Sequence, residues 1–437
     1  MDAPLTYTPP LLLKSLVVDR GIAPVSAAQE SIGGHMTATL DRGEFGESDD
    51  FIFSGSIASR FNGNSDGSST ALKSTLSNNH HKLSALFSHD EGDDTRVGDD
   101  DKIGGSQYRR GRYDLSYGWR NDNSSIEIYT GELDTRDTGT PALPFGEIVI
   151  SGHLSYNHVD HLMDNFSQRE APVSPMSYRA NNATAHNTAW SLQARWPVAS
   201  GYLSVGTDGN ETVHTATITN PNSALFEVDN FNDAERDTYG VFTEWEGEIG
   251  EWHVETGARV NRVKMDSESV SARGMMGMMA MNADMLASAF NNGDLDEDFT
   301  YLDLVLNLSR PLTNNTTLNL GLGRKNRAPS YQERYLWLPL AATGGLADGR
   351  NYIGNLKLDE ETAHEVTAGI DWQTAKAWVT PQLFYRRIDD YIQGVPSDNA
   401  TANMLSTMMS GQAALMFDNV DAKMYGADMG YGYLISS

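Results

Sequence analysis

Two side chains that could bind a soft metal ion stand two residues apart in the segment Asn157–Asn165. His161 offers an imidazole nitrogen, which suits both oxidation states of copper, and Met163 offers a thioether, which favours Cu(I). In an extended strand, residues i and i+2 point to the same side, so the two side chains can converge on one ion. A His-x-Met pair is also a common accident of composition, so its surroundings must support the hypothesis.

A second set of sulfur ligands is concentrated between residues 275 and 285, which hold six of the chain's 17 methionines. They are Met275, Met276, Met278, Met279, Met281 and Met285. Glycines interrupt the segment and its flanks are polar, so we expect a long flexible loop whose exposed thioethers capture Cu(I) before delivery. A methionine-rich core helix is the alternative. A looser group in another expected loop could serve likewise: Met404, Met408, Met409 and Met416.

Other chemistries find little support in the composition. The chain has no cysteine, which excludes disulfides, thiolate catalysis and cysteine metal sites within these 437 residues. No Asp or Glu stands in a motif that sets a general acid against a base, so we expect no enzyme activity. The acidic run Asp99–Asp101 lacks the ligand spacing of a calcium loop. The net charge of −27 argues against nucleic acid as a partner, because phosphate binding needs a basic face.

The elements that must position these residues are expected to be strands. Apolar and polar residues alternate in Trp252–Asn261, 302–309, 318–323 and 365–372, which is the period-two pattern of a strand with one apolar face. No run of eighteen apolar residues predicts a transmembrane helix, so a membrane-spanning chain would need a closed barrel. Very polar loops such as His89–Lys102, and aromatic residues near strand ends, favour a barrel surrounded by lipid over a soluble β-sandwich.

The N-terminal residues follow a different pattern. Leu11–Val18 is a compact apolar stretch, and Ile32–Leu40 is a strand that opens with glycines. This pattern is typical of the end of a small globular domain and not of a barrel hairpin, and its glycines permit close backbone approach. We therefore expect a boundary near residue 45, with a small domain over residues 1–45 and a barrel over residues 46–437.

Several segments, in order along the chain, resemble the TonB-dependent receptors of the bacterial outer membrane. Ser15–Gly21, followed by Ser31–Gly34, resembles the end of that family's plug domain. Arg327–Tyr335 and Asn355–Glu361 resemble its barrel signatures, and Asn419–Tyr433 resembles a late barrel strand. The resemblance implies an all-β fold, a transmembrane antiparallel β-barrel around an N-terminal plug. It also implies a place in the outer membrane and a partner in the TonB energy-coupling protein of the inner membrane.

The resemblance further implies a parent barrel of about 22 strands. The residues after the boundary supply about 16 strands, at roughly 25 residues per strand and loop. We therefore expect a fragment that lacks both ends, with most of the plug missing before it and the last strands missing after it. Such an incomplete barrel would expose unpaired strand edges and would neither insert into a membrane nor transport.

Within this family, the chain looks most like the copper receptors. Met1–Pro4 resembles the second half of a plug motif in which a Cys and a Met stand four residues apart, and Asn157–Asn165 matches a His-x-Met segment. The resemblance implies a copper site made by Met1 of the plug with His161 and Met163 of the barrel wall, completed by a Cys upstream of Met1. The transported substrate would then be a copper ion or a copper complex.

Other functions stay open at the level of the sequence. A siderophore or cobalamin receptor has the same fold, although its pockets favour aromatic and basic groups over a set of Met and His. A passive porin or an adhesion barrel would not need the plug-like start. A secreted soluble β-protein would pack the apolar faces of its strands against each other.

Overall fold

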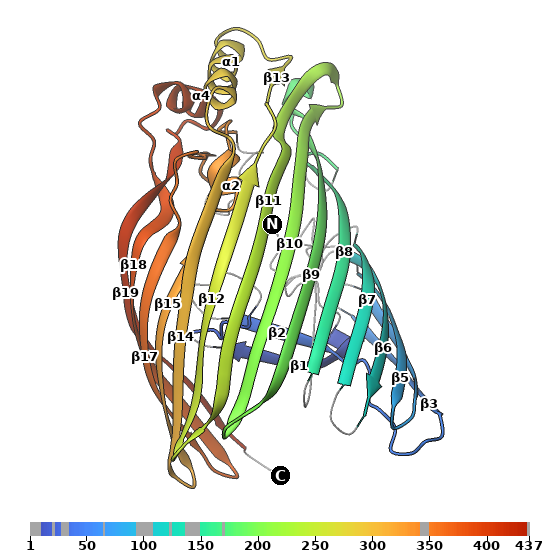
Figure 1. Cartoon of the computed structure of the whole chain (residues 1–437). Coiled ribbons are helices and arrows are strands. Elements are labelled where there is room, and N and C mark those ends of the chain that lie inside the picture. The colour runs from blue at the N-terminus through green and yellow to red at the C-terminus, as the bar shows by residue number, and fades with distance from the viewer. Residues whose placement is uncertain are drawn as a thin grey trace.

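A computed structural model describes the chain apart from residues 1–9, 20–21, 28–34, 64–65, 93–107, 122–124, 136–148, 168–170, 341–348 and 435–437. Figure 1 shows a tall barrel of tilted strands, with helices at one end and short turns at the other. In outer-membrane barrels the short turns are periplasmic and the long loops extracellular. The helical end is therefore called the extracellular end, and the opposite end the periplasmic end.

The described residues place seventeen strands in one sheet, and three α-helices lie in the long connections. The longer strands of the wall are β3 (Ile52–Asn62), β4 (Gly67–Ser77), β5 (His81–Gly92), β6 (Tyr108–Arg120), β7 (Ser125–Thr135), β8 (Val149–Asp164), β9 (Ala180–Val198), β10 (Gly201–Asn220), β11 (Ser223–Ile249), β12 (Trp252–Asp266), β14 (Glu297–Thr313), β15 (Thr316–Arg327), β17 (Glu361–Gln373), β18 (Ala377–Pro396) and β19 (Leu415–Tyr433). The short strands are β13 (Ala272–Arg273) and β16 (Tyr352–Ile353). The helices are α1 (Met278–Asn291), α2 (Tyr331–Tyr335) and α4 (Ala400–Ser410).

In the order of strands around the barrel, β19 precedes β3. Within the described residues no paired register joins these two strands, and β3 is exposed along almost its whole length. The expectation of unpaired strand edges therefore stays a prediction. Long neighbouring strands run antiparallel, as predicted, except that β7 and β8 run parallel over Ser125–Tyr129 and Val149–His153. The antiparallel prediction is wrong at this pair. Parallel neighbours need a long connection, and residues 136–148, which join these two strands, lie outside the described residues.

The apolar faces of the strands look outward and the polar faces look into the lumen. The alternating segments of the sequence lie in β12, β14, β15 and β17, as predicted. Leu304 and Leu322 are 43% and 49% exposed, whereas Asp303, one position before Leu304, and Lys325, three positions after Leu322, are 1% and 2% exposed. A barrel in lipid requires this inversion of the soluble pattern. Among the described residues, no helix is long and apolar enough to cross a membrane.

A two-stranded sheet lies inside the barrel, separate from the wall (Figure 1). It consists of β1 (Leu13–Asp19) and β2 (His35–Leu40). Between these strands, Ile22 and Val25 are buried against glycines of the inner wall. A Cβ atom on Gly257 would lie 2.2 Å from Cγ2 of Val25, so only glycine leaves room for this contact.

Polar contacts anchor the same inner residues to the wall. The backbone N–H of Ser26 donates to Oε2 of Glu244 at 3.1 Å. Arg42, just after β2, donates two hydrogen bonds to Asp114 of β6 at 2.8 and 2.9 Å, and its guanidinium lies 3.7 Å from the ring centre of Tyr129. Arg42 and Asp114 are both buried, and a buried bidentate pair is costly to break. These contacts fix the N-terminal residues inside the lumen.

Candidate functional site

His161 and Met163 lie on β8, on the face that looks into the lumen. Met163 stands opposite Asn181 of β9, which in turn stands opposite Ile218 of β10. Ile218 is fully buried in a cluster inside the extracellular end of the barrel, so this face of β8 is the inner face. Met163 is 46% exposed, and His161 is partly buried two positions away on the same face.

The third predicted ligand, Met1, lies outside the described residues. In the part of the chain that the structure describes, no group of three or more His, Cys, Asp or Glu side chains is placed to hold a metal ion. Methionine is not one of these four residue types, so Met163 can still be a ligand. His161 and Met163 supply only two ligands, and a metal site that includes them needs at least one more from another part of the chain.

The methionine-rich segment forms a helix and not the flexible loop that the glycines suggested. Helix α1 begins at Met278, directly after Gly277. Met, Ala and Leu are strong helix formers, and the buried residues Ala283, Leu286 and Phe290 recur at helical spacing. The prediction of a flexible loop is wrong because an apolar stripe of the segment can be buried only as a helix.

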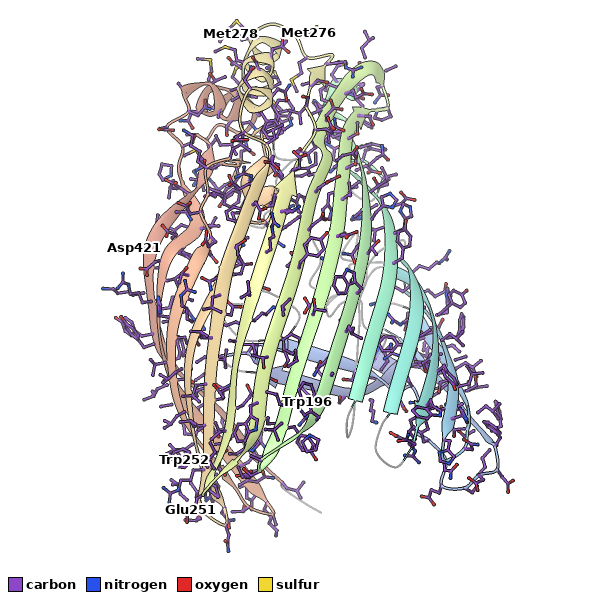
Figure 2. All side chains as sticks on the ribbon, in the orientation of Figure 1. Trp196, Glu251, Trp252, Met276, Met278 and Asp421 are labelled. Carbon is purple, nitrogen blue, oxygen red and sulfur yellow. The ribbon has the colours of Figure 1, made fainter. Side chains whose placement is uncertain are left out.

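The methionines of this segment divide between two environments. Met275 and Met279 pack against the hydrophobic cluster. The other four are exposed by 52% to 77%: Met276, Met278, Met281 and Met285. Three of these recur at helical spacing and so share one face of α1. Figure 2 shows Met276 and Met278 at the outermost extracellular tip of the molecule.

The second methionine group is also largely helical. Met404, Met408 and Met409 lie in α4 and are 40% to 48% exposed, whereas Met416 lies in β19 against the hydrophobic cluster. Helices α1 and α4 pack against each other at the extracellular end (Figure 1). Two segments far apart in the sequence thus bring their sulfur atoms to one end of the barrel. We call the exposed set the thioether surface: Met276, Met278, Met281, Met285, Met404, Met408 and Met409.

Beneath the thioether surface, a hydrophobic cluster lies inside the extracellular end of the barrel, along the strands from β10 to β19. Helix α2 and the residues after it contribute Tyr335, Leu336 and Leu338, none more than 2% exposed. Nε1 of Trp337 donates to the carbonyl oxygen of Asp229 on β11 at 2.7 Å. The segment that resembles a family signature thus packs inside the extracellular end of the barrel, a role that its sequence did not indicate.

Buried charges hold α2 in place. Arg327, the last residue of β15, donates to Glu333 at 2.9 Å and to the fully buried Glu361 at 2.7 Å. Ser330 and Glu333 form a capping box at the start of α2. Burial alone would raise the pKa of Glu333, but the hydrogen bonds and charge of Arg327 outweigh it and hold this pKa below its usual value. Both partners of the pair are therefore charged at neutral pH.

A neutral histidine supports the same helix. The ring of His214 on β10 lies flat against Tyr331 of α2, with ring centres 4.1 Å apart and planes 13° apart. Burial lowers the pKa of His214 to about 4, because the imidazolium form would lose its hydration. At neutral pH this contact is therefore a stack of two uncharged rings.

The inner wall below the mouth is polar and internally paired. Arg259 donates to Asp208 at 2.5 and 2.7 Å and to Asn261 at 2.6 Å. Lys325 lies 3.4 Å from Asp303, which also accepts from Asn261. All five side chains are buried, and each charge has an opposite partner. Such a wall can hydrogen-bond a passing group without presenting a strong excess of either charge.

Comparison with known proteins identifies the fold. Residues 39–436 match the family model of TonB-dependent receptor-like β-barrels. A search of curated proteins found no match. The solved structure of the copper transporter OprC is 20% identical with a TM-score of 0.71, covering 100% of this chain and 66% of that one. The siderophore receptor PirA from Pseudomonas aeruginosa is 13% identical with a TM-score of 0.53, covering 97% and 70%. The haemophore receptor HasR of Serratia marcescens is 14% identical with a TM-score of 0.59, covering 98% and 68%.

At these identities the solved structures show a shared fold, and the chain spans 66% of the length of the copper transporter. The family model, in contrast, covers most of the chain. It agrees with the predicted transmembrane β-barrel and with the predicted place in the bacterial outer membrane. Members of this family are transport receptors and not enzymes. The chain therefore belongs to the TonB-dependent receptor β-barrel family.

Proposed function

We propose that this chain is the barrel of a TonB-dependent receptor that imports copper, with energy supplied by the TonB protein of the inner membrane. In this proposal residues 1–45 are the C-terminal part of the plug domain and residues 46–437 belong to the barrel. The copper ion, free or complexed, is the transported substrate. The observation that carries the proposal is the thioether surface at the extracellular end.

Exposed methionine is an unusual use of an apolar side chain. Burying a Met side chain normally stabilises a fold by about 1.5 to 3 kcal/mol. Helix α1 already buries Leu286 and Phe290 on its inner face, yet leaves Met278, Met281 and Met285 in solvent at helical spacing. Thioether sulfur is a soft ligand that favours Cu(I) over the hard ions that carboxylates prefer. A surface that captures Cu(I) at the entrance accounts for these positions.

His161 and Met163 are proposed to take the ion next, inside the lumen, with Met1 as a third ligand. Their side chains share the inner face of β8 two positions apart, a spacing of about 7 Å along the strand. Imidazole and thioether together suit copper. This lumen site and the thioether surface can be separated by mutation because they lie on different elements.

A siderophore receptor, which would carry a ferric chelate, is the second candidate, because the siderophore receptor PirA shares the fold. It predicts uptake of an iron-loaded chelate that does not depend on the methionines. A passive porin is less consistent with the β1–β2 sheet inside the lumen, which contacts the wall through Arg42 and Asp114.

The test is Cu(I) binding by the purified chain, measured under reducing conditions by competition with a chromophoric Cu(I) chelator. The variant M276L/M278L/M281L/M285L removes the exposed sulfur atoms of α1 and of the residues just before it, while keeping apolar side chains of similar volume. We expect its Kd for Cu(I) to rise by about tenfold, equivalent to about 1.4 kcal/mol. In H161A/M163A we expect the thioether surface still to bind Cu(I), and we expect the Cu(I) binding that belongs to the lumen site to be lost.

The matched control is M275L/M279L, which changes the inward methionines of the same segment. We expect it to bind Cu(I) as the unchanged chain does. An equal loss in this control, or no loss in the quadruple variant, would contradict the proposed role of the thioether surface. Uptake of ferric chelates by cells that carry H161A/M163A, with no copper uptake in the parent, would favour the second candidate.

A further inference from the structure

Two histidines face each other on the outer side of the wall, one on β8 and one on β9. His158 stands opposite His186 in the antiparallel register. Since His161 and Met163 look into the lumen, His158 looks outward, because it is an odd number of positions away from them on the same strand. Nδ1 of His158 lies 3.2 Å from Nδ1 of His186, and the two ring centres are 4.5 Å apart. Both side chains are exposed, so solvent reaches these nitrogens.

The neighbours of this pair decide where its protons lie. Nε2 of His158 lies 3.1 Å from Oδ2 of Asp160, the next outward residue of β8. An ionised carboxylate only accepts hydrogen bonds, so Nε2 carries the proton, and neutral His158 directs the lone pair of Nδ1 at His186. The hydroxyl oxygen of Tyr156 lies 2.9 Å from Nδ1 of His186. Two nitrogen lone pairs repel each other at 3.2 Å, so a proton or a metal cation must lie between them.

The spacing of the two nitrogens fits a metal ion. Zinc–imidazole bonds are about 2.0 to 2.1 Å long, so two nitrogens on one ion are about 3.3 Å apart at a tetrahedral angle. At the right angles of a square-planar or octahedral ion they are about 2.9 Å apart. The observed 3.2 Å lies between these values. Metal-bound histidines almost always donate their other N–H to a partner such as a carboxylate, as His158 donates to Asp160.

The surroundings favour a hydrated cation. Glu211 of β10 stands opposite Thr188, one outward position from His186, so a second carboxylate adjoins the pair besides Asp160. In the described part of the chain, neither carboxylate forms an ion pair with an arginine or a lysine. The described residues bring no third His, Cys, Asp or Glu ligand to this point, so water would complete the coordination of an ion bound here.

The pair also lies where β8 is supported from one side. Residues Val149–His153 of β8 pair with β7, but beyond His153 the described register gives β8 a partner only in β9. An ion held by one histidine from each strand would tie β8 to β9 in this part. The inner face of the same part of β8 carries His161 and Met163, so the link would also fix the strand that presents them.

From this geometry we infer a metal site on the outer side of the β8–β9 pair. His158 and His186 bind one divalent ion of the kind that imidazole prefers, namely Zn²⁺, Ni²⁺ or Cu²⁺, and Asp160 orients His158. The site is separate from the lumen and from the thioether surface, and it does not rest on the proposed import of copper. Its role is to link two strands, and the ion bound there is not cargo.

The test is binding of Ni²⁺ to the purified chain, without an affinity tag and in detergent, measured by isothermal titration calorimetry. Ni²⁺ is the probe because imidazole suits it, whereas thioethers select softer ions. We expect H158A/H186A to lose one equivalent of bound Ni²⁺. D160A keeps both imidazoles, and we expect its Kd for Ni²⁺ to rise by about 10- to 100-fold, as is typical when the partner of a metal-bound histidine is removed.

A second measurement reports on the link between the strands. Ni²⁺ should slow the hydrogen–deuterium exchange of residues 154–162 in the unchanged chain and leave it unaltered in H158A/H186A. The matched control is H89A, because His89 is also an exposed strand histidine beside a carboxylate, at 3.5 Å from Glu91, but stands opposite Thr70 and Gly111. We expect H89A to bind Ni²⁺ as the unchanged chain does.

Three results would overturn the inference. One is the same amount and affinity of bound Ni²⁺ in H158A/H186A as in the unchanged chain, which would leave only a proton between the two rings. Another is unchanged affinity in D160A, and the third is an equal loss in H89A. Folding is checked by the gel shift of the unheated barrel. If the double variant does not fold, H186Q must lose the same equivalent, and unchanged binding there counts against the site. Cu(I) binding by the thioether surface should persist in H158A/H186A, so the two proposals fail separately.

Discussion

Removing Arg327 should loosen the extracellular mouth of the barrel. Arg327 bridges Glu333 of α2 and Glu361 of β17, and the Glu361 side chain is fully buried. Replacing Arg327 with Gln leaves two carboxylates near each other without their cation. Breaking a buried pair by removing one partner typically costs about 3 to 5 kcal/mol, because the remaining charge has no compensation. Glu361 still accepts from the backbone N–H of Ile392 at 2.8 Å, which favours the lower end of that range.

The assay is hydrogen–deuterium exchange of residues 331–340 in the detergent-solubilised barrel. A cost of about 3 kcal/mol raises the population of the open mouth by roughly 100-fold. Arg273→Gln is the control, because Arg273 forms an exposed pair with Glu227 at 3.4 Å and surface pairs contribute at most about 1 kcal/mol. Exchange of residues 331–340 in Arg327→Gln within about fivefold of the unchanged chain would refute the reasoning.

The pH dependence of this stabilisation gives a second test, because its direction should differ between the unchanged chain and Arg327→Gln. In the unchanged chain the pKa of Glu333 is lowered, so its contribution to stability is present above the unfolded pKa of about 4.5 and is lost as pH falls through the folded value. Without Arg327, burial is the largest remaining influence and raises this pKa. The mouth of Arg327→Gln should therefore become more protected as pH falls, which is the opposite trend.

Two further predictions concern single contacts. His214 is buried against Tyr331, and because burial lowers its pKa to about 4, the folded state favours the neutral ring; this stabilisation is complete above about pH 6.5 and is lost as pH falls toward 4. In His214→Phe, exchange of residues 331–335 should lose that part of its pH dependence, and an unchanged pH profile would contradict it. Gly257→Ala would place a Cβ 2.2 Å from Val25 and 2.9 Å from the carbonyl oxygen of Thr243, so limited proteolysis should cut residues 22–27 faster. Gly63→Ala, with no atom within 4 Å of its Cβ, is the control and should leave cleavage unchanged.

The strands of the wall could be predicted from the sequence, because apolar and polar residues alternate where one face of a strand meets lipid and the other meets the lumen. Leu304 faces lipid and its neighbour Asp303 faces the lumen, so the sequence of each strand shows which face points outward. The order of the strands around the barrel could not be predicted in this way, because that order is a property of the whole sheet and not of any one strand.

The extracellular end was harder to predict because its apolar residues follow no single period. Tyr335–Leu340 reads as a short apolar run, and its burial depends on partners in α1, β11 and β19. The glycines before α1 suggested a loop, although the spacing of Ala283, Leu286 and Phe290 after Gly277 was a helix signal available in the sequence.

The cluster inside the extracellular end is held differently from the wall around it. Helix α2 and residues 336–340 are held by Arg327, by the stack of His214 on Tyr331 and by apolar packing. The strands β11 and β15 are held on both sides by ladders of backbone hydrogen bonds. Hydrogen–deuterium exchange should therefore be faster in residues 331–340 than in β11 or β15, and exchange as slow as in these strands would contradict the argument.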